Sequence, residues 1–293
     1  MTQIRKDIEA LRTISIFGIV WFHAGAAGID IAYSGLIVFL ILSIYLVGHQ
    51  TVPFELSIRR RFSRLMIPWI IWFAIYGLWN ALSGRPLIEH QNGIIAGILV
   101  GPSVHLWYLP YIFLALVSFD RLRCYVQGRN LAIVSAALTI LAFVFVPHWR
   151  QTSMLLGYPW AQYAHALPGL LIGAFFLNYR ELPAHTAKFL AVLMLIAACS
   201  RIPYPGIGTP YAIGICAGYA IANHSIAHAS FFPIAAWGRN AFGVYLIHIL
   251  ILRVILKVNI IQGALVPIVT FVLSMIIIAS VRRALPRAAR YVF

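Results

Sequence analysis

An arginine and a histidine eleven positions apart are the first residues of this sequence that could act together chemically. They are Arg12 and His23, near the two ends of a largely apolar segment. Eleven residues make about three turns of an α-helix, so both side chains lie on one face, with His23 roughly 16 Å further along the axis. If this apolar segment spans a membrane, His23 lies deep within it, and an ionisable group there is a candidate for function. The imidazole ring of histidine suits proton transfer. We predict that His23 is a catalytic base. The structural alternative is a neutral ring that hydrogen-bonds a neighbouring helix.

A group of arginines after the second apolar run indicates a site for phosphate. Arg60, Arg61 and Arg64 lie just before Pro68, where we expect a basic loop to end and the third helix to begin. The planar guanidinium group donates two parallel hydrogen bonds, which suits a phosphate. We predict that these arginines and Arg12 grip the phosphates of one substrate. The alternative is that the loop sets the membrane topology and contacts lipid headgroups.

Further polar and aromatic side chains lie close to apolar runs and could line a substrate cleft. Tyr245 and His248 are three residues apart on one helix face, where they form a polar contact between helices or orient an acceptor. The same two roles are open to His105. Trp107 and Tyr108 line a substrate cleft, or belong to an interfacial aromatic belt.

The remaining histidines and the cysteines indicate no metal site. His148 and His165, for example, are expected in loops or at helix ends, at solvated positions. Cys124, Cys199 and Cys216 have no metal-ligand spacing. We expect no bound metal or cofactor.

The composition predicts that these residues lie in a membrane protein. The chain has 293 residues, of which 62% are hydrophobic and 10% charged, and its mean hydropathy is +0.89. So few charges cannot cover a water-exposed surface. We expect residues 1–293 to form one integral membrane domain. The net charge of +15 is explained by basic loops on the cytoplasmic side that contact membrane lipids, and we expect no nucleic-acid partner.

The hydropathy pattern predicts an all-α, polytopic protein with about ten transmembrane helices. The apolar runs centre near Ile19, Leu40, Phe73, Phe113, Leu138, Leu171, Leu193, Ile215, Leu246 and Val272. If each run crosses the membrane once, most of the basic residues fall on one side of the membrane. The other side then holds Arg85, Arg150, Arg201, Arg253 and Lys257. The positive-inside rule therefore places both termini in the cytoplasm. We see no internal repeat.

Several short segments, in order along most of the chain, resemble the acyltransferase 3 family of integral membrane acyltransferases. Arg12 and His23 match its pair on the first helix, with ten residues between them. The other matching segments are residues 7–12, 35–48, 60–68, 105–109 and 238–248. One such segment alone would be a weak sign of the family, whereas the whole set in the family's order is a specific one.

The resemblance implies a membrane O-acyltransferase that takes acyl-CoA from the cytoplasm. Acetyl-CoA is the expected co-substrate. The acceptor would be a hydroxyl of a cell-surface polysaccharide or its lipid-linked precursor. The expected location is the bacterial inner membrane, and proteins of polysaccharide synthesis or export are candidate partners. The alternatives are a proton-coupled secondary transporter and an acyltransferase that acts on a lipid or a small molecule.

The sequence departs from the family pattern at two positions of the second helix. Ile37 stands where the family often has Asp, and Ile44 stands where Gly follows Ser43. The first change puts a role for that carboxylate in doubt. The second is expected to affect how closely the second helix packs on the first.

Overall fold

The computed structural model describes residues 5–48, 53–88, 92–223 and 237–293, and all regular structure in these residues is helical. The helices that contain the ten predicted centres are α1 (Lys6–His23), α3 (Ser34–Gly48), α5 (Ile67–Leu82), α7 (Tyr108–Leu122), α8 (Gly128–Val144), α10 (Trp160–Leu177), α11 (Ala184–Cys199), α12 (Gly208–Ala222), α14 (Ala241–Val258) and α15 (Leu265–Ala284). The shorter elements are α2 (Ile29–Ala32), α4 (Phe54–Arg61), η1 (Phe62–Met66), α6 (Ile94–Val100), η2 (Val104–Trp107), α9 (Val146–Leu156), η3 (Tyr179–Glu181), η4 (Gly238–Asn240) and α16 (Pro286–Val292). The prediction of an all-α fold is confirmed.

Some of these helices are long and apolar enough to cross a membrane unaided. Within the described residues there are four such stretches, Ile29–Gly48, Phe54–Leu82, Gly238–Val258 and Leu265–Ala284. Two bent pairs, α6 with η2 and α7, and α8 with α9, would raise the number to six. The chain is therefore a membrane protein. Ten spans and cytoplasmic termini stay predictions.

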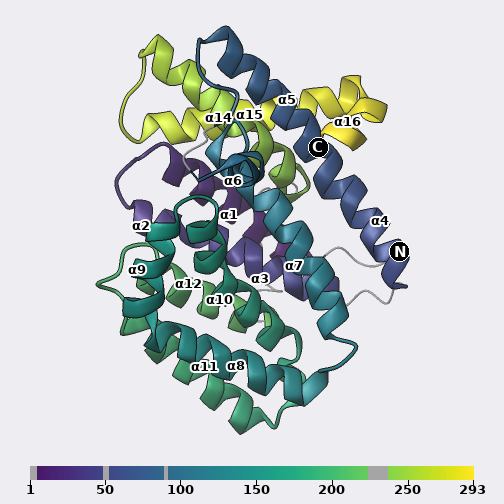
Figure 1. Cartoon of the computed structure of the whole chain (residues 1–293), viewed down its shortest axis with the longest axis vertical. Helices are drawn as coiled ribbons and strands as arrows, with labels where there is room; N and C mark the ends of the chain where they lie inside the picture. The colour runs from purple at the N-terminus through teal and green to yellow at the C-terminus, as the bar shows by residue number, and fades with distance from the viewer. Residues whose placement is uncertain (1–4, 49–52, 89–91, 224–236) are drawn as a thin grey trace.

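Helix α3 lies at the centre of the bundle and contacts α1, α7, α10 and α12 (Figure 1). On one side, α8 and α11 cover α10 and α12. On the other side, α14 and α15 pack on each other and on α1. Two glycines bring the central helices close together, because Gly35 of α3 lies against the backbone of Ser15 and Gly173 of α10 lies against Ile41. The core thus runs along α3, and α1 lies between the two sides.

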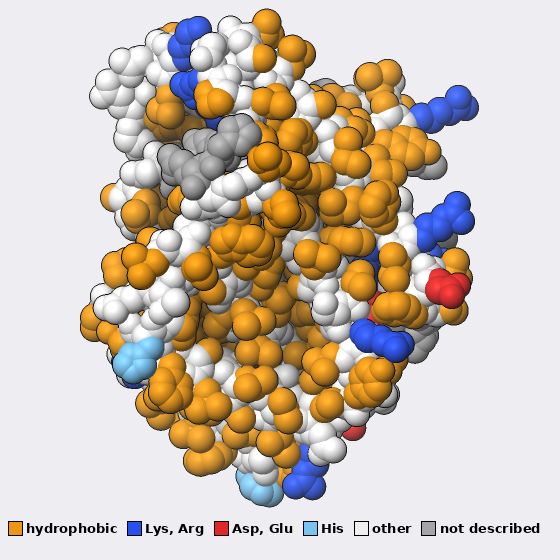
Figure 2. Space-filling view, viewed as in Figure 1, with side chains coloured by type: hydrophobic (Ala, Val, Ile, Leu, Met, Phe, Trp, Pro, Cys, Tyr) orange, Lys and Arg blue, Asp and Glu red, His pale blue; other side chains and the backbone are white. Residues whose placement is uncertain are grey.

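The outer surface of the bundle is apolar. In Figure 2, hydrophobic side chains cover most of the visible face, and the basic side chains lie at its margins. Leu82, Leu155 and Ile260 are each at least 80% exposed. Apolar side chains exposed to this extent favour contact with lipid.

The arginine-rich stretch before Pro68 is helical, so the prediction of a basic loop was wrong. Phe54–Leu82 form one long helical stretch, in which η1 is a short π-helix. Pro68 has no N–H for the carbonyl of residue 64, and its ring would clash with that carbonyl in a regular α-helix. A π-helical turn before the proline accommodates it without ending the helix, and it carries Arg64.

Candidate active site

Three histidines from distant parts of the chain come together in the bundle. His23 is the last residue of α1, His105 lies in η2 and His248 lies in α14. The ring centroids of His23 and His248 are 5.2 Å apart, as are those of His105 and His248, and those of His23 and His105 are 6.3 Å apart. The sequence singled out each histidine separately, and the packing of η2 and α14 against the end of α1 groups them.

Hydrogen bonds fix two of these rings and leave one nitrogen of each without a partner. His248 Nδ1 lies 2.7 Å from the carbonyl oxygen of Tyr245. Because a carbonyl only accepts, this nitrogen carries the hydrogen. Ser103 Oγ lies 3.0 Å from His105 Nδ1. The Nε2 atoms of His105 and His248 are buried and have no hydrogen-bond partner in the described protein. His105 lines a cavity beside His23, whereas His248 is fully buried and lines neither that cavity nor its larger neighbour.

His23 opens onto a small cavity, the histidine cavity, of about 140 Å³. Its wall includes His105 and the aromatic side chains of Trp107, Tyr108 and Tyr245, all of which were predicted to line a cleft. Trp107 and Tyr245 are buried. The structure therefore brings these predicted residues together around one histidine, although their roles stay predictions.

A second cavity, the basic cavity, gathers the four predicted phosphate-binding residues. It has a volume of about 760 Å³, and Arg12, Arg60, Arg61 and Arg64 all line it. Cavities of roughly 300–1,000 Å³ are typical of small-molecule sites. Because Arg12 and His23 lie near opposite ends of α1, this cavity opens at the other end of that helix.

The arginines of the basic cavity have different partners. Arg12 pairs with Glu9 at 2.9 Å. Arg61 pairs with Asp120 of α7 at 2.6 Å, and the same carboxylate accepts a hydrogen bond from Ser57. Arg61 also donates to a carbonyl of α7, so it holds the α4–η1 stretch on α7. Arg60 and Arg64 are exposed and form none of the ion pairs found among the described residues.

The basic cavity and the histidine cavity share one wall. Ile19, Leu36, Tyr108 and Tyr245 line both cavities. The two cavities are therefore neighbours, and α1 runs along both. A molecule anchored in the basic cavity has to pass Tyr108 and Tyr245 to reach His23.

Hydrogen bonds hold the two tyrosines of this wall. The hydroxyl groups of Tyr108 and Ser43 lie 3.3 Å apart, and Tyr245 donates to the backbone carbonyl of His105. The two tyrosine rings are 5.5 Å apart. The same contacts thus join α3 to α7, and α14 to η2, at the point where the cavities meet.

Sequence reasoning missed several residues around this site and misplaced one. Tyr33 and Gln162 also line the histidine cavity, but neither shows a spacing signal. His165 was expected to be solvated, yet it is buried in α10 and contacts the rings of Tyr33 and Tyr211. That prediction was wrong because residues 160–177 continue as one helix through the histidine. His148 is exposed, as predicted.

No group of three or more His, Cys, Asp or Glu side chains in the described part of the chain is placed to hold a metal ion. The guanidinium groups around the basic cavity can bind an anionic group of a substrate. The His23 ring, which lines the neighbouring histidine cavity, can move a proton at some distance from that anion.

These features define an integral membrane protein with an internal polar site between its helices. The family model described as the acyltransferase domain, of the acyltransferase 3 family, matches residues 5–282, so the chain belongs to that family and is a membrane acyltransferase. No curated protein and no solved structure matches the chain. The family match lends no support to the transporter alternative.

Proposed function

We propose that this protein transfers an acetyl group from acetyl-CoA to a hydroxyl of a surface polysaccharide or its lipid-linked precursor. Membership of the family supports acyl transfer. The observation that carries the finer proposal is the pair of adjoining cavities: one is lined by Arg12, Arg60 and Arg64, and the other contains His23. Acetyl-CoA carries several phosphates at one end and its thioester at the other. Its phosphates therefore match the cavity lined by arginines, and its thioester matches the cavity that contains His23.

The basic cavity binds the CoA portion of the donor. Arg60 and Arg64 are the principal phosphate ligands, because neither is engaged in an ion pair of the described residues. Arg12 adds a third guanidinium group, while Arg61 maintains the shape of the cavity through Asp120. The pantetheine arm then extends between Tyr108 and Tyr245 towards His23.

His23 acts as the base. It takes the proton of the acceptor hydroxyl while the hydroxyl oxygen attacks the thioester carbonyl carbon, which forms a tetrahedral intermediate. Collapse of this intermediate breaks the carbon–sulfur bond and leaves the new ester. The departing CoA thiolate receives the proton from His23, so the enzyme returns to its initial state. The unpartnered Nε2 atom of His105, which lines the same cavity, forms a hydrogen bond with a second polar group of the acceptor and so orients it.

The location and partners of the protein follow from the same proposal. It resides in the bacterial inner membrane, takes its donor from the cytoplasm and completes transfer at the far end of α1. Proteins of polysaccharide synthesis or export present the acceptor there. A lipid or small-molecule acceptor would use the same donor and base, so the donor reaction tests the common part of the proposal.

The test measures turnover of labelled acetyl-CoA by purified protein with and without His23. We expect His23→Ala to reduce the rate by about 10²–10⁴-fold, which is the usual contribution of a general base. His148→Ala is the matched control, because His148 is exposed and lines neither cavity. Circular dichroism and gel filtration verify that both variants fold. Acetyl-CoA turnover that is equal in the wild type and His23→Ala would refute the assignment of the base.

A further inference from the structure

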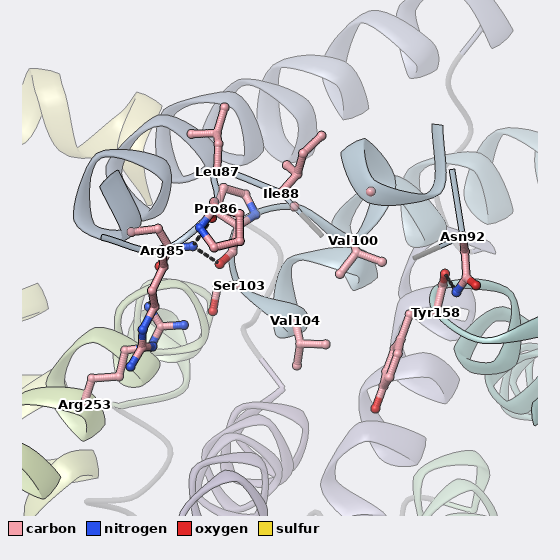
Figure 3. Close-up of a pocket in the computed structure, with 14 residues that line it drawn as sticks. Arg85, Pro86, Leu87, Ile88, Asn92, Val100, Ser103, Val104, Tyr158 and Arg253 are labelled. Atoms are coloured by element: carbon pink, nitrogen blue, oxygen red, sulfur yellow. Dashed lines mark hydrogen bonds between the residues drawn. The ribbon is translucent and has the colours of Figure 1, made fainter. Parts of the chain in front are cut away.

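A third cavity, the two-arginine cavity, lies at the His23 end of the bundle and has no assigned role. Its volume is about 370 Å³, and its wall includes Arg85, from the segment after α5, and Arg253 of α14. Figure 3 shows the side chains of Arg85 and Arg253 on the same wall. Two positive charges therefore line one cavity.

The positive charge of this cavity has no carboxylate partner among the described residues. No Asp or Glu is found among the lining residues, and the ion pairs of the described chain all lie elsewhere. Two like charges close together are unfavourable in a partly buried setting. An anion bound between them would offset that repulsion, and the fork of each guanidinium group matches a phosphate.

Arg253 is held in place for such a ligand. Its guanidinium group donates to Asn80 Oδ1 at 3.2 Å and lies over the ring of Tyr76, 5.7 Å from the centroid. Asn80 is buried and donates in turn to the carbonyl of Pro102 at 2.8 Å. A cation fixed by a buried amide and an aromatic ring loses little freedom when it binds an anion.

The two-arginine cavity adjoins the histidine cluster. Val104 and Tyr158 line both this cavity and the histidine cavity. Ser103 also lines it, and its hydroxyl contacts His105 Nδ1. A ligand anchored at Arg85 can therefore extend a hydroxyl group past these side chains towards His23.

We propose that Arg85 and Arg253 bind a phosphate or diphosphate group of the acceptor. The acceptor class is then a phosphate-bearing sugar, such as a lipid-linked sugar diphosphate, and not a neutral glycan. This inference rests on the proposed function, because it names the substrate that receives the acyl group. It adds that donor and acceptor are each anchored by arginines, in separate cavities at the two ends of α1.

The test uses inorganic pyrophosphate as the probe, with full-length protein in phosphatidylcholine nanodiscs. Saturating CoA is added to occupy the basic cavity, and pyrophosphate binding is measured by equilibrium dialysis. We expect the Arg85→Gln, Arg253→Gln double variant to bind pyrophosphate at least about tenfold more weakly than the wild type, because two charged hydrogen-bond donors are lost. Arg85→Gln alone should also weaken binding. This single variant guards against misfolding, because the Arg85 side chain is exposed and donates no hydrogen bond in the described structure.

Lys257→Gln is the matched control, because Lys257 is an exposed cation of the same helix that does not line the cavity. Equal binding by the wild type and the double variant would overturn the inference, as would an equal loss in Lys257→Gln. A second set of nanodiscs contains one-third phosphatidylglycerol. Unchanged pyrophosphate binding there supports an acceptor phosphate, whereas competition by this lipid identifies a headgroup as the occupant and overturns the acceptor assignment.

Binding of labelled CoA to the same preparations separates this inference from the proposed function. If the protein binds CoA but no pyrophosphate, the proposed acceptor site is refuted and the proposed donor site stands. Pyrophosphate binding that depends on Arg85, without CoA binding, would remove only the donor assignment.

Discussion

Replacement of Gly35 by alanine tests whether the close contact between α1 and α3 positions His23. A Cβ atom on Gly35 would lie 2.2 Å from the backbone oxygen of Ser15, whereas ordinary contacts begin at 3.4 Å. Because the obstacle is backbone, α1 has to move away from α3 by roughly 1 Å. Displacements of about 1 Å at a reacting group can lower a rate by about 10²-fold. We therefore expect Gly35→Ala to lower kcat for acyl transfer by that factor.

The assay compares kcat and KM for acetyl-CoA, with thermal unfolding followed in parallel. Alanine favours a helix over glycine by about 1 kcal/mol, so a weaker helix cannot explain a slower reaction. Overpacking is expected to cost about 1–3 kcal/mol of stability. Gly18→Ala should behave in the same way, because its Cβ would meet the backbone oxygen of Ala32 at 2.6 Å.

The matched control is Gly77→Ala in α5. Its Cβ would lie 2.6 Å from a terminal methyl group of Leu87, whose side chain is 53% exposed and can rotate away. We expect kcat to stay within about twofold of the wild type in this control. A wild-type kcat for Gly35→Ala would refute the reasoning, because His23 would then hold its position without the close approach of α1 to α3.

Three further substitutions test the partners of the site. Arg12→Ala should raise KM for acetyl-CoA by about tenfold with little change in kcat, because it removes binding to a part of the donor that does not react; steady-state kinetics would show the opposite pattern if Arg12 acted in the chemical step. Asp120→Asn removes the carboxylate that holds Arg61, so we expect a loss of about 1.5–3 kcal/mol of stability and a higher donor KM, and an unchanged melting temperature would contradict this. Tyr76→Phe removes a hydroxyl that bonds α14 on either side of His248; we expect a lower melting temperature and slower transfer, and the idea fails if both match the wild type.

The sequence predicted the helices well, because each apolar run is a local signal. All ten predicted centres fall inside helices of the structure. The basic stretch was misread because Pro68 usually marks a helix start, whereas a π-helical turn lets the helix continue through it. Hydropathy shows that a segment is apolar, but not that a sharp bend precedes η2 and α7 or that another follows α8.

The site was predictable only where its residues share one helix. The eleven-residue spacing of Arg12 and His23 is visible in the sequence because helical geometry is regular. The grouping of His105 and His248 with His23 depends on how distant helices pack, and no local pattern encodes that. Arg85 and Arg253 were read as ordinary basic residues of the far side, since nothing in the sequence indicates that they line one cavity.

The two departures from the family pattern lie away from the histidine cavity. Ile37 is fully buried, and its side chain lies against Gly214 of α12. Ile44 is also buried and packs against Gly173 of α10. A carboxylate in place of Ile37 would therefore be placed among apolar side chains, at a large desolvation cost. The contact between α3 and α1 depends on Gly35 instead, so Ile44 does not control it.

In this chain the groups that orient two of the histidines lie in, or directly before, the elements that carry them. The Tyr245 carbonyl fixes His248 from within α14, and Ser103 fixes His105 from the segment before η2. Neither interaction needs a charged group on α3, whose role is to bring α1 close through Gly35. The histidine cluster of this chain therefore needs no carboxylate on α3, because backbone and hydroxyl groups supply the hydrogen bonds at no cost of burying a charge.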